Sequence, residues 1–314
     1  DELMRRFESN GRVALTNKKS SASVFSFGRD HGLFGRILNQ TVIVTQSLAM
    51  RGDKEIVGTC FTPQDGNSLL SSLAATLWFL YPDSKEQKIE LGRQHKTAAE
   101  LYQALRDEAK GGQPLAWNGL PDWSGIYSRP LDKGFNFDID QPQGVPTTAK
   151  LTPEFQTKLL KRIDDLKRGI EWDPISTCAP PGVPRWLTEP FLREFIVTPD
   201  QTWLINEMVN DIRRVYTDGR EHVPEEDRYP IPNGDSIGFW DGSKLIMHTN
   251  QLQSGIYQRA NPDYTDQVET VEIWQKSDDK TMSVDVWVYD PPALVEPWYV
   301  KHTYGQLSNP DKKL

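Results

Sequence analysis

A group of polar side chains lies within residues 216–272, a stretch that otherwise carries short apolar runs and turns. The group combines hydroxyl, imidazole and carboxyl side chains: Tyr216, His222, Asp235, Asp241, His248 and Glu272. If several of them point into an apolar interior, desolvation shifts their pKa values and makes them useful as acids and bases. We therefore take His248 and Asp235 as candidate bases and Tyr216 as the candidate acid. The competing interpretation is structural, because Asp241 suits a turn, His222 lies in a Pro- and Glu-rich loop, and half of all strand positions face water.

Tryptophans form the second candidate set. The chain has ten of them in 314 residues, and nine lie at residue 117 or later. Most buried tryptophans pack a core, but rigid indoles with a single donor also line pockets for aromatic or sterol-like ligands. We expect the ligand-binding side chains to be Trp203, Trp240, Trp274 and Trp287, together with His222.

The chain contains the residue pattern of a serine-hydrolase motif, but the residues that follow do not fit the structure that the motif needs. Residues 234–238 read G-D-S-I-G, and the G-x-S-x-G motif works only where a strand turns sharply into a helix. The residues that follow, 239–242, are typical of a strand that runs into a tight turn. We therefore expect Gly234 and Gly238 to serve a bulge or a close contact between strands.

The sequence predicts no cofactor and no metal. The five histidines lack metal-ligand spacing, and neither Cys60 nor Cys178 has a C-x-x-C neighbour. No glycine-rich phosphate loop or dinucleotide fingerprint is present. The two cysteines leave two alternatives open, a long-range disulfide or two separately buried thiols.

Composition and charge exclude two further classes. Lys and Arg number 36 against 44 Asp and Glu, which gives a net charge of −8, and the two signs are interspersed. A nucleic-acid binder needs a concentrated basic face, so this class is not expected. The longest strongly apolar stretch, residues 69–81, is shorter than the roughly 20 residues that a membrane span needs. We expect no membrane span.

Two composition shifts predict a domain boundary near residues 111–114. Nineteen of the 22 prolines and nine of the ten tryptophans lie at residue 117 or later. The sequence thus predicts a mixed α/β N-terminal segment, 1–112, and a β-rich domain, 113–314. In the first, residues 41–45 and 55–61 read as strands, and helices are expected after Asn67 and after Thr97, where Glu100 completes a capping box.

The C-terminal part predicts one helix followed by a β-meander. A helix is expected over 152–169, beginning at Thr152-Pro153-Glu154. Beyond Pro190, nine short runs read as strands: 191–198, 202–208, 212–216, 236–240, 244–249, 255–259, 268–275, 282–289 and 298–304. Asp218-Gly219 and Asp241-Gly242 are hairpin signals. The predicted fold is α+β, with an antiparallel meander closing into a lipocalin-like barrel.

The later part of the chain resembles a large family of exported and mostly uncharacterised bacterial proteins. The resemblance covers about residues 113–309 and rests on ordered runs: PDWSGIY from Pro121, CAPPGVPR from Cys178, YTDGREH from Tyr216, NGDSIGFWDG from Asn233, DPP from Asp290 and Pro297-Trp298. It implies export to the periplasm of a Gram-negative bacterium and a β-rich domain, but no established reaction. Members of the family carry a Pro-His-Ser segment and another histidine before the last hairpin, whereas residues 262–269 of this chain contain no histidine.

Three functions follow as hypotheses. The first is an exported small-molecule-binding barrel for an apolar or aromatic ligand. The second is a cofactor-independent lyase, isomerase or hydrolase that acts on such a ligand inside the barrel. The third is a structural or assembly subunit that forms a homo-oligomer through its N-terminal half. A histidine and a carboxylate converging within hydrogen-bond distance at a cavity favour the enzyme, and isolated polar groups favour the binding protein.

Overall fold

The computed structural model of the chain consists of two compact units, residues 1–83 and 84–314. In the first unit it describes one sheet in the order β1-β2-β3-β4-β5: β1 (Thr16–Lys18), β2 (Ala22–Phe25), β3 (His31–Leu38), β4 (Thr41–Leu48) and β5 (Cys60–Phe61). In the second it describes residues 84–130, 137–138, 148–170, 173–258 and 261–308. Strand β4 contains the predicted strand at 41–45, and β5 overlaps the one at 55–61. The helix predicted after Asn67 lies outside the described residues.

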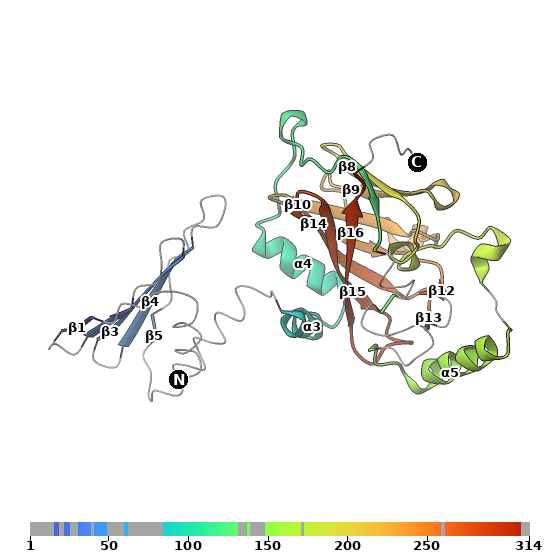
Figure 1. Ribbon diagram of the computed structural model, residues 1–314, viewed down its shortest axis with the longest axis horizontal. Coiled ribbons are helices and arrows are strands. Elements are labelled where there is room, and N and C mark those ends of the chain that lie inside the picture. Colours follow the sequence, from blue (N-terminus) through green and yellow to red (C-terminus); the bar gives the residue numbers. More distant parts are fainter. Residues whose placement is uncertain are drawn as a thin grey trace. The chain divides into compact units, whose positions relative to one another are not determined.

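The second unit is built on a closed barrel of nine strands (Figure 1). Around the barrel the order is β10-β11-β14-β15-β16-β6-β7-β8-β9. The strands are β6 (Ile126–Ser128), β7 (Arg193–Val197), β8 (Gln201–Asn206), β9 (Asp211–Tyr216), β10 (Asp235–Asp241), β11 (Lys244–Asn250), β14 (Glu269–Asp278), β15 (Thr281–Tyr289) and β16 (Trp298–Gln306). The prediction of a closed β-barrel is confirmed.

The barrel is mixed, which differs from the predicted all-antiparallel meander. Strands β9 and β10 run parallel, with Ser236 beside Val215, and this pair closes the barrel. The expected hairpin at Asp218-Gly219 is therefore wrong, because a parallel connection needs a longer crossover, here residues 217–234. The hairpin at Asp241-Gly242 does join β10 to β11, with Gly242 at a positive φ of 61°. The run at 255–259 contributes only β12 (Gly255–Ile256), which pairs with β13 (Asp263–Tyr264) in a separate small sheet.

One face of the strands forms a packed aromatic interior. Phe195 on β7 contacts Trp274 on β14 at 5.4 Å between ring centroids, although three strands separate β7 from β14 in the barrel order. Trp274 also stacks on Tyr304, and Trp240 meets Trp123 edge-on at 5.0 Å. These residues are almost completely buried. Aromatic side chains from opposite walls therefore meet in the middle of the barrel, as small barrels require.

A buried ion pair lies among these aromatic side chains. The Arg213 guanidinium donates to both carboxylate oxygens of Glu272, at 2.9 and 3.2 Å, and both side chains are 0% exposed. Glu272 also accepts from Trp274 Nε1 at 2.8 Å and from Thr270 Oγ1 at 3.0 Å. Because several donors share this carboxylate, its charge is compensated without water.

Two helices, α3 (Lys85–Arg93) and α4 (Ala98–Glu108), cover the outer face of β10, β11 and β14–β16 (Figure 1). Thr97 caps α4 as predicted, since its hydroxyl accepts from Glu100 N. The expected capping box is not completed, because the Glu100 carboxylate accepts from Lys96 N rather than from Thr97 N. Leu101 and Tyr102 on α4 are buried against the sheet. Both helices thus belong to the second unit, so the predicted boundary at residues 111–114 falls after α4 rather than between the two compact units.

Helix α5 (Pro153–Lys167) confirms the helix predicted over 152–169. Its buried residues are Phe155, Leu159 and Ile163. The Thr152 hydroxyl does not cap the helix but donates to Pro292 O. The other helices among the described residues are short 3-10 turns: η1 (Trp117–Gly119), η3 (Pro174–Thr177), η4 (Arg185–Leu187), η5 (Met208–Asn210) and η6 (Glu225–Asp227). Cys178, at the end of η3, is a free and exposed thiol rather than a buried one.

Gly92 allows α3 to approach the barrel. A Cβ at this position would lie 2.7 Å from Cδ1 of Trp287, whose Nε1 donates to Lys88 O at 2.7 Å. We expect Gly92→Ala to lower the free energy of unfolding by about 1–3 kcal/mol, because the indole is held between helix and sheet and cannot retreat. Urea unfolding followed by tryptophan fluorescence measures this change. Gly119→Ala is the control, since nothing lies within 4 Å of its added Cβ. An unchanged midpoint for Gly92→Ala would show that α3 does not dock in this way.

Candidate functional site

Four side chains form a continuous hydrogen-bonded chain on the outer face of the barrel. The Asp235 Oδ2 atom lies 2.7 Å from His222 Nδ1, and His222 Nε2 lies 2.9 Å from His248 Nδ1. His248 Nε2 in turn lies 3.0 Å from Glu269 Oε2. Each contact has the length of a normal hydrogen bond. We call Asp235, His222, His248 and Glu269 the four-residue chain.

Strand register brings three of these residues to one end of the sheet. Asp235 is the first residue of β10 and Glu269 the first of β14, while His248 is near the end of β11 between them. Side chains alternate between the two faces of a strand, and these three share the outer face with Ile237, Ile246 and Val271. The Tyr102 ring of α4 stacks on the His248 ring at 5.6 Å and covers it.

The crossover between β9 and β10 supplies the fourth residue, His222. Asp235 Oδ2 accepts a second hydrogen bond from Val223 N, and Gln251 Nε2 donates to Val223 O. Earlier in the crossover, the Arg220 guanidinium lies 3.8 Å above the Tyr216 ring and binds the Asp218 carboxylate. These contacts fix the crossover against the barrel and hold the His222 ring between Asp235 and His248.

Burial and hydrogen bonding set the protonation of this chain. Burial acts to raise the pKa of Asp235, but the hydrogen bonds from His222 and Val223 N outweigh it and bring that pKa below its ordinary value of 3.8. Asp235 is therefore ionised at neutral pH. Burial lowers the pKa of His248 below 6.5, although the contact with Glu269 opposes this shift.

A large cleft of about 680 Å³ opens beside Asp235. It lies between β9, the end of the crossover and the start of β10, and its lining combines one carboxylate of the chain with a phenol and a guanidinium: Asp235, Tyr216 and Arg214. Its apolar lining consists of two prolines and four exposed side chains: Pro180, Pro232, Ile212, Val223, Ile231 and Tyr229. The cleft thus offers both an apolar surface and groups that can donate or accept protons.

Two polar atoms in the large cleft lack partners. Asp211 Oδ2 and Asn233 Oδ1 are buried and have no hydrogen bond among the described residues, although Asn233 Nδ2 donates to the other Asp211 oxygen at 2.5 Å. Burial raises the pKa of Asp211 above 3.8 despite that hydrogen bond and the nearby Arg213. Buried acceptors without partners are costly unless a ligand or water supplies donors.

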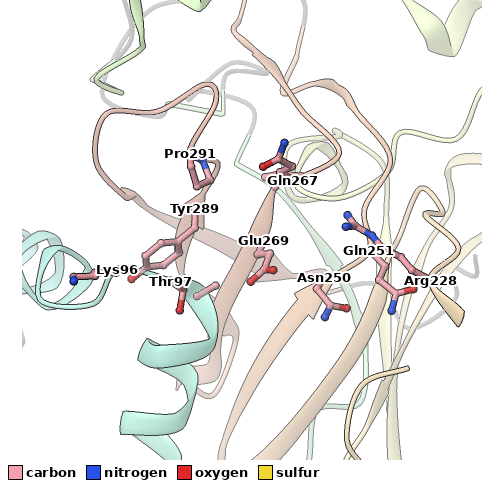
Figure 2. Close-up of a pocket in the computed structure, with 11 residues that line it drawn as sticks. Lys96, Thr97, Arg228, Asn250, Gln251, Gln267, Glu269, Tyr289 and Pro291 are labelled. Carbon is pink, nitrogen blue, oxygen red and sulfur yellow. The ribbon is translucent and has the colours of Figure 1, made fainter. Parts of the chain in front are cut away.

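A smaller cleft of about 250 Å³ opens beside Glu269, at the other end of the four-residue chain. Figure 2 shows the Glu269 side chain in this cleft, with Thr97 on one side and Asn250 on the other. Lys96 and Arg228 add two cations to the lining. Gln251 lines both clefts, so the two openings lie on either side of this residue.

The two glycines of the G-x-S-x-G pattern serve close contacts between strands, as predicted. A Cβ on Gly238 would lie 2.8 Å from Ile246 O, and Gly234 has φ +63° with Asn250 O only 2.3 Å from its added Cβ. Ser236 is buried, and its hydroxyl is bonded to Thr249 Oγ1 at 2.8 Å. The serine is therefore part of the interior and is not an exposed nucleophile.

The structure brings the three candidate catalytic residues together on the outer face, whereas the sequence predicts an interior site. Asp235 and Tyr216 line the same cleft, and His248 joins Asp235 through His222. Glu272 belongs to the interior ion pair, and Asp241 lies at the far end of β10. Glu269 and Tyr102 were not predicted as site residues. The signal for Glu269 is that a charged residue stands at the first position of a strand, on its outward face.

The candidate ligand-binding tryptophans are spread over both faces of the barrel. Trp240 and Trp274 are in the packed interior, and Trp287 lies under α3 on the outer face. Trp203 is half-buried on β8, with the Arg214 guanidinium 5.3 Å above its ring. Of the four, Trp203 is thus adjacent to a residue of the large cleft. A ligand-binding role for these tryptophans stays a prediction.

Within the described parts of the chain, no group of three or more His, Cys, Asp or Glu side chains converges as metal ligands would. No helix in those parts is long and apolar enough to span a bilayer. Comparison of the chain with protein-family models, curated proteins and solved structures finds no match.

Proposed function

We propose that this protein is a cofactor-independent enzyme that transfers protons to and from a small organic molecule bound in the large cleft. The single observation behind this proposal is the position of Asp235. Its carboxylate lines a cleft that is large enough for a ligand, and it also ends a hydrogen-bonded chain of two histidines. Carboxylates that are oriented by histidine and open to a cleft are typical of general acid–base sites.

Asp235 acts as the base. Both hydrogen bonds to its carboxylate go to Oδ2, and among the described residues Oδ1 has no partner. Oδ1 takes a proton from a carbon next to a carbonyl group, and the electron pair of the broken C–H bond forms the C=C bond of an enolate. The negative charge then develops on the carbonyl oxygen, and the proton returns to the same or to a neighbouring carbon.

Tyr216 stabilises the enolate oxygen. The parallel register places Tyr216 beside Ile237, two residues along the strand from Asp235 on the same face. Both side chains line the large cleft, so a ligand carbonyl bound there can reach the phenol and the carboxylate. The Arg220 guanidinium lies on the Tyr216 ring and is itself paired with Asp218, so the Tyr216 hydroxyl is the donor assigned to the enolate oxygen.

The lining defines the ligand class. Three branched aliphatic side chains, Ile212, Val223 and Ile231, favour an apolar or aromatic body, and a cleft of about 680 Å³ has the size of ordinary small-molecule sites. The partnerless Asp211 and Asn233 oxygens favour a ligand with a hydroxyl or amine donor. The substrate is therefore an organic carbonyl compound with an apolar body and a second polar group.

Deuterium exchange tests this function without knowledge of the product. The protein is incubated in D2O with three carbonyl compounds, 2-tetralone, phenylacetone and cyclohexenone, and label at the carbon next to the carbonyl is measured by mass spectrometry. We expect protein-dependent exchange into at least one of them. Asp235→Asn should slow it at least about hundredfold, because general base catalysis contributes about 10²–10⁴-fold. Tyr216→Phe should slow it about tenfold or more.

Asp241→Asn is the matched control for Asp235→Asn. Asp241 lies on the same strand and the same face, at the opposite end of β10, and does not line the large cleft. Exchange by this variant should equal that of the wild type. The proposal is wrong if none of the three compounds exchanges, or if Asp235→Asn exchanges as fast as Asp241→Asn.

A second candidate function is binding of the same ligand class without chemistry. The exposed apolar residues of the cleft favour it, since Ile212, Val223 and Ile231 are each about 40% exposed or more. In that case 2-tetralone binds, as measured by calorimetry, but does not exchange. Export to the periplasm, lipocalin-like ligand carriage in the interior and self-association, all expected from the sequence, stay predictions.

A further inference from the structure

The two ends of the four-residue chain open into different clefts. Asp235 lines the large cleft and Glu269 the smaller one, while His222 and His248 bridge them. The side chain of His248 is only 4% exposed, whereas that of Glu269 is 35% exposed. A proton therefore has the most open route to solvent at Glu269, since His248 is closed to solvent and the side chain of His222 is 16% exposed.

The short contacts fix the number of protons in the chain. Each of the three links joins two atoms that carry lone pairs, so each needs one proton to be attractive. Three protons on two carboxylates and two imidazoles give a net charge of −1. When all three protons lie on the atoms nearer the large cleft, Asp235 is protonated, Glu269 is ionised and both imidazoles are neutral. When all three have crossed their links, Asp235 is ionised and Glu269 is protonated.

We propose that the four-residue chain is a proton relay between the two clefts, with Glu269 as its solvent port. Uptake of the substrate proton at Asp235 Oδ1 gives the chain a fourth proton, and Glu269 releases one proton to solvent. The Asp235 carboxyl group and both imidazole rings then turn so that each remaining proton lies in a link, on the side of the large cleft. In the transfer step one proton crosses each of the three links, no electron is transferred, and the net charge of the chain stays −1. The step converts a protonated Asp235 and an ionised Glu269 into an ionised Asp235 and a protonated Glu269. This inference rests on the proposed function, because it explains how Asp235 is restored while a ligand covers the large cleft.

The surroundings favour transfer along the chain rather than loss from it. Tyr102 covers the His248 ring, and the neighbouring charges are largely paired with one another: Arg106 with Glu221 at 3.5 Å and Arg220 with Asp218 at 2.7 Å. At the port, Lys96 and Arg228 lie at the edges of the cleft that contains Glu269 (Figure 2). Thr97, Asn250 and Gln267 are uncharged.

A ligand-free experiment tests the relay independently of any reaction. Side-chain 15N signals of His222 and His248 report which ring nitrogen carries a proton. We expect both rings to change together when pH is varied, as one coupled unit. Glu269→Gln should alter the His222 signals as well as those of His248, although the Glu269 carboxylate is hydrogen-bonded to the His248 ring and not to the His222 ring. Glu108→Gln, an exposed carboxylate at the end of α4, is the control and should alter neither.

The deuterium-exchange reaction provides a second test of the relay. With 2-tetralone in D2O near neutral pH, Glu269→Gln should slow label incorporation about tenfold, which is a smaller effect than that of Asp235→Asn. Without the relay, the proton on Asp235 reaches solvent only after the ligand has left the large cleft. Glu269→Asp should restore part of the rate because it keeps the carboxylate. His248→Gln breaks the chain in its middle and should match Glu269→Gln.

The outcomes separate the two proposals. If Asp235→Asn stops exchange while Glu269→Gln neither slows it nor changes the His222 signals, the relay is overturned and the proposed function stands. If no compound exchanges but Glu269→Gln still changes the His222 signals, the relay stands and the proposed function fails. If Glu269→Gln changes the His248 signals alone, the chain is not continuous and the relay is overturned whatever the exchange rates are.

Discussion

Glu272→Gln is expected to lower the free energy of unfolding of the second unit by about 3–5 kcal/mol. The substitution keeps the shape of the side chain but removes the charge that compensates Arg213, and both side chains are fully buried inside the barrel. An uncompensated guanidinium in this aromatic interior has no access to water. Urea unfolding followed by tryptophan fluorescence measures the change, because nine of the ten tryptophans belong to this unit.

A double variant separates charge from packing in this result. Arg213→Met combined with Glu272→Leu removes both charges and should recover most of the lost free energy, since apolar groups of similar volume replace a buried ion pair at little cost. Asp164→Asn is the control, because its partner Arg168 forms an exposed pair on α5 that contributes less than about 1 kcal/mol. If the double variant is no more stable than Glu272→Gln, the loss arises from packing and not from the unpaired charge.

Local patterns predicted most of the barrel. The strands β14, β15 and β16 were recognisable because alternation and β-branched residues report burial on one face, which is a local property. Residues 126–128 were missed, since three residues are too few to show a period, and yet β6 completes the barrel between β16 and β7. The β9–β10 connection was misjudged because Asp218-Gly219 has the chemistry of a hairpin turn, whereas strand direction depends on contacts far along the chain.

The candidate site was predictable only in part. Asp235 and His248 were found because they are polar residues in otherwise apolar strands, and their register across the β10–β11 hairpin follows from the turn at Asp241-Gly242. His222 was assigned to ligand binding, since no local pattern shows that a crossover loop folds back onto the sheet. Whether a strand face is inside or outside depends on which face α4 covers, so the outer position of the site could not be derived from alternation alone.

His302 makes the stability of the second unit depend on pH. It is fully buried on β16, neither ring nitrogen has a hydrogen-bond partner among the described residues, and its ring lies 5.3 Å from that of Phe137. Burial, and then the positive charges of Arg129 and Arg193, hold the pKa of His302 well below 6.5. In the unfolded chain the same imidazole takes up a proton near its ordinary value of about 6.5. Between these two values the unfolded state binds one more proton than the folded state.

The free energy of unfolding is therefore fully retained above about pH 6.5 and falls by about 1.4 kcal/mol for each pH unit below it, until the folded pKa is reached. Buried His248, whose pKa is also lowered, adds to the same slope. Urea unfolding between about pH 7.5 and 5.5 measures the effect, in a range above the ordinary pKa values of carboxylates. His302→Met should flatten the dependence, because its unfolded state has no imidazole at this position. Val300→Ala, on the same strand and the same interior face, should lower the free energy of unfolding equally at every pH, so a slope unchanged in His302→Met would refute the assignment to His302.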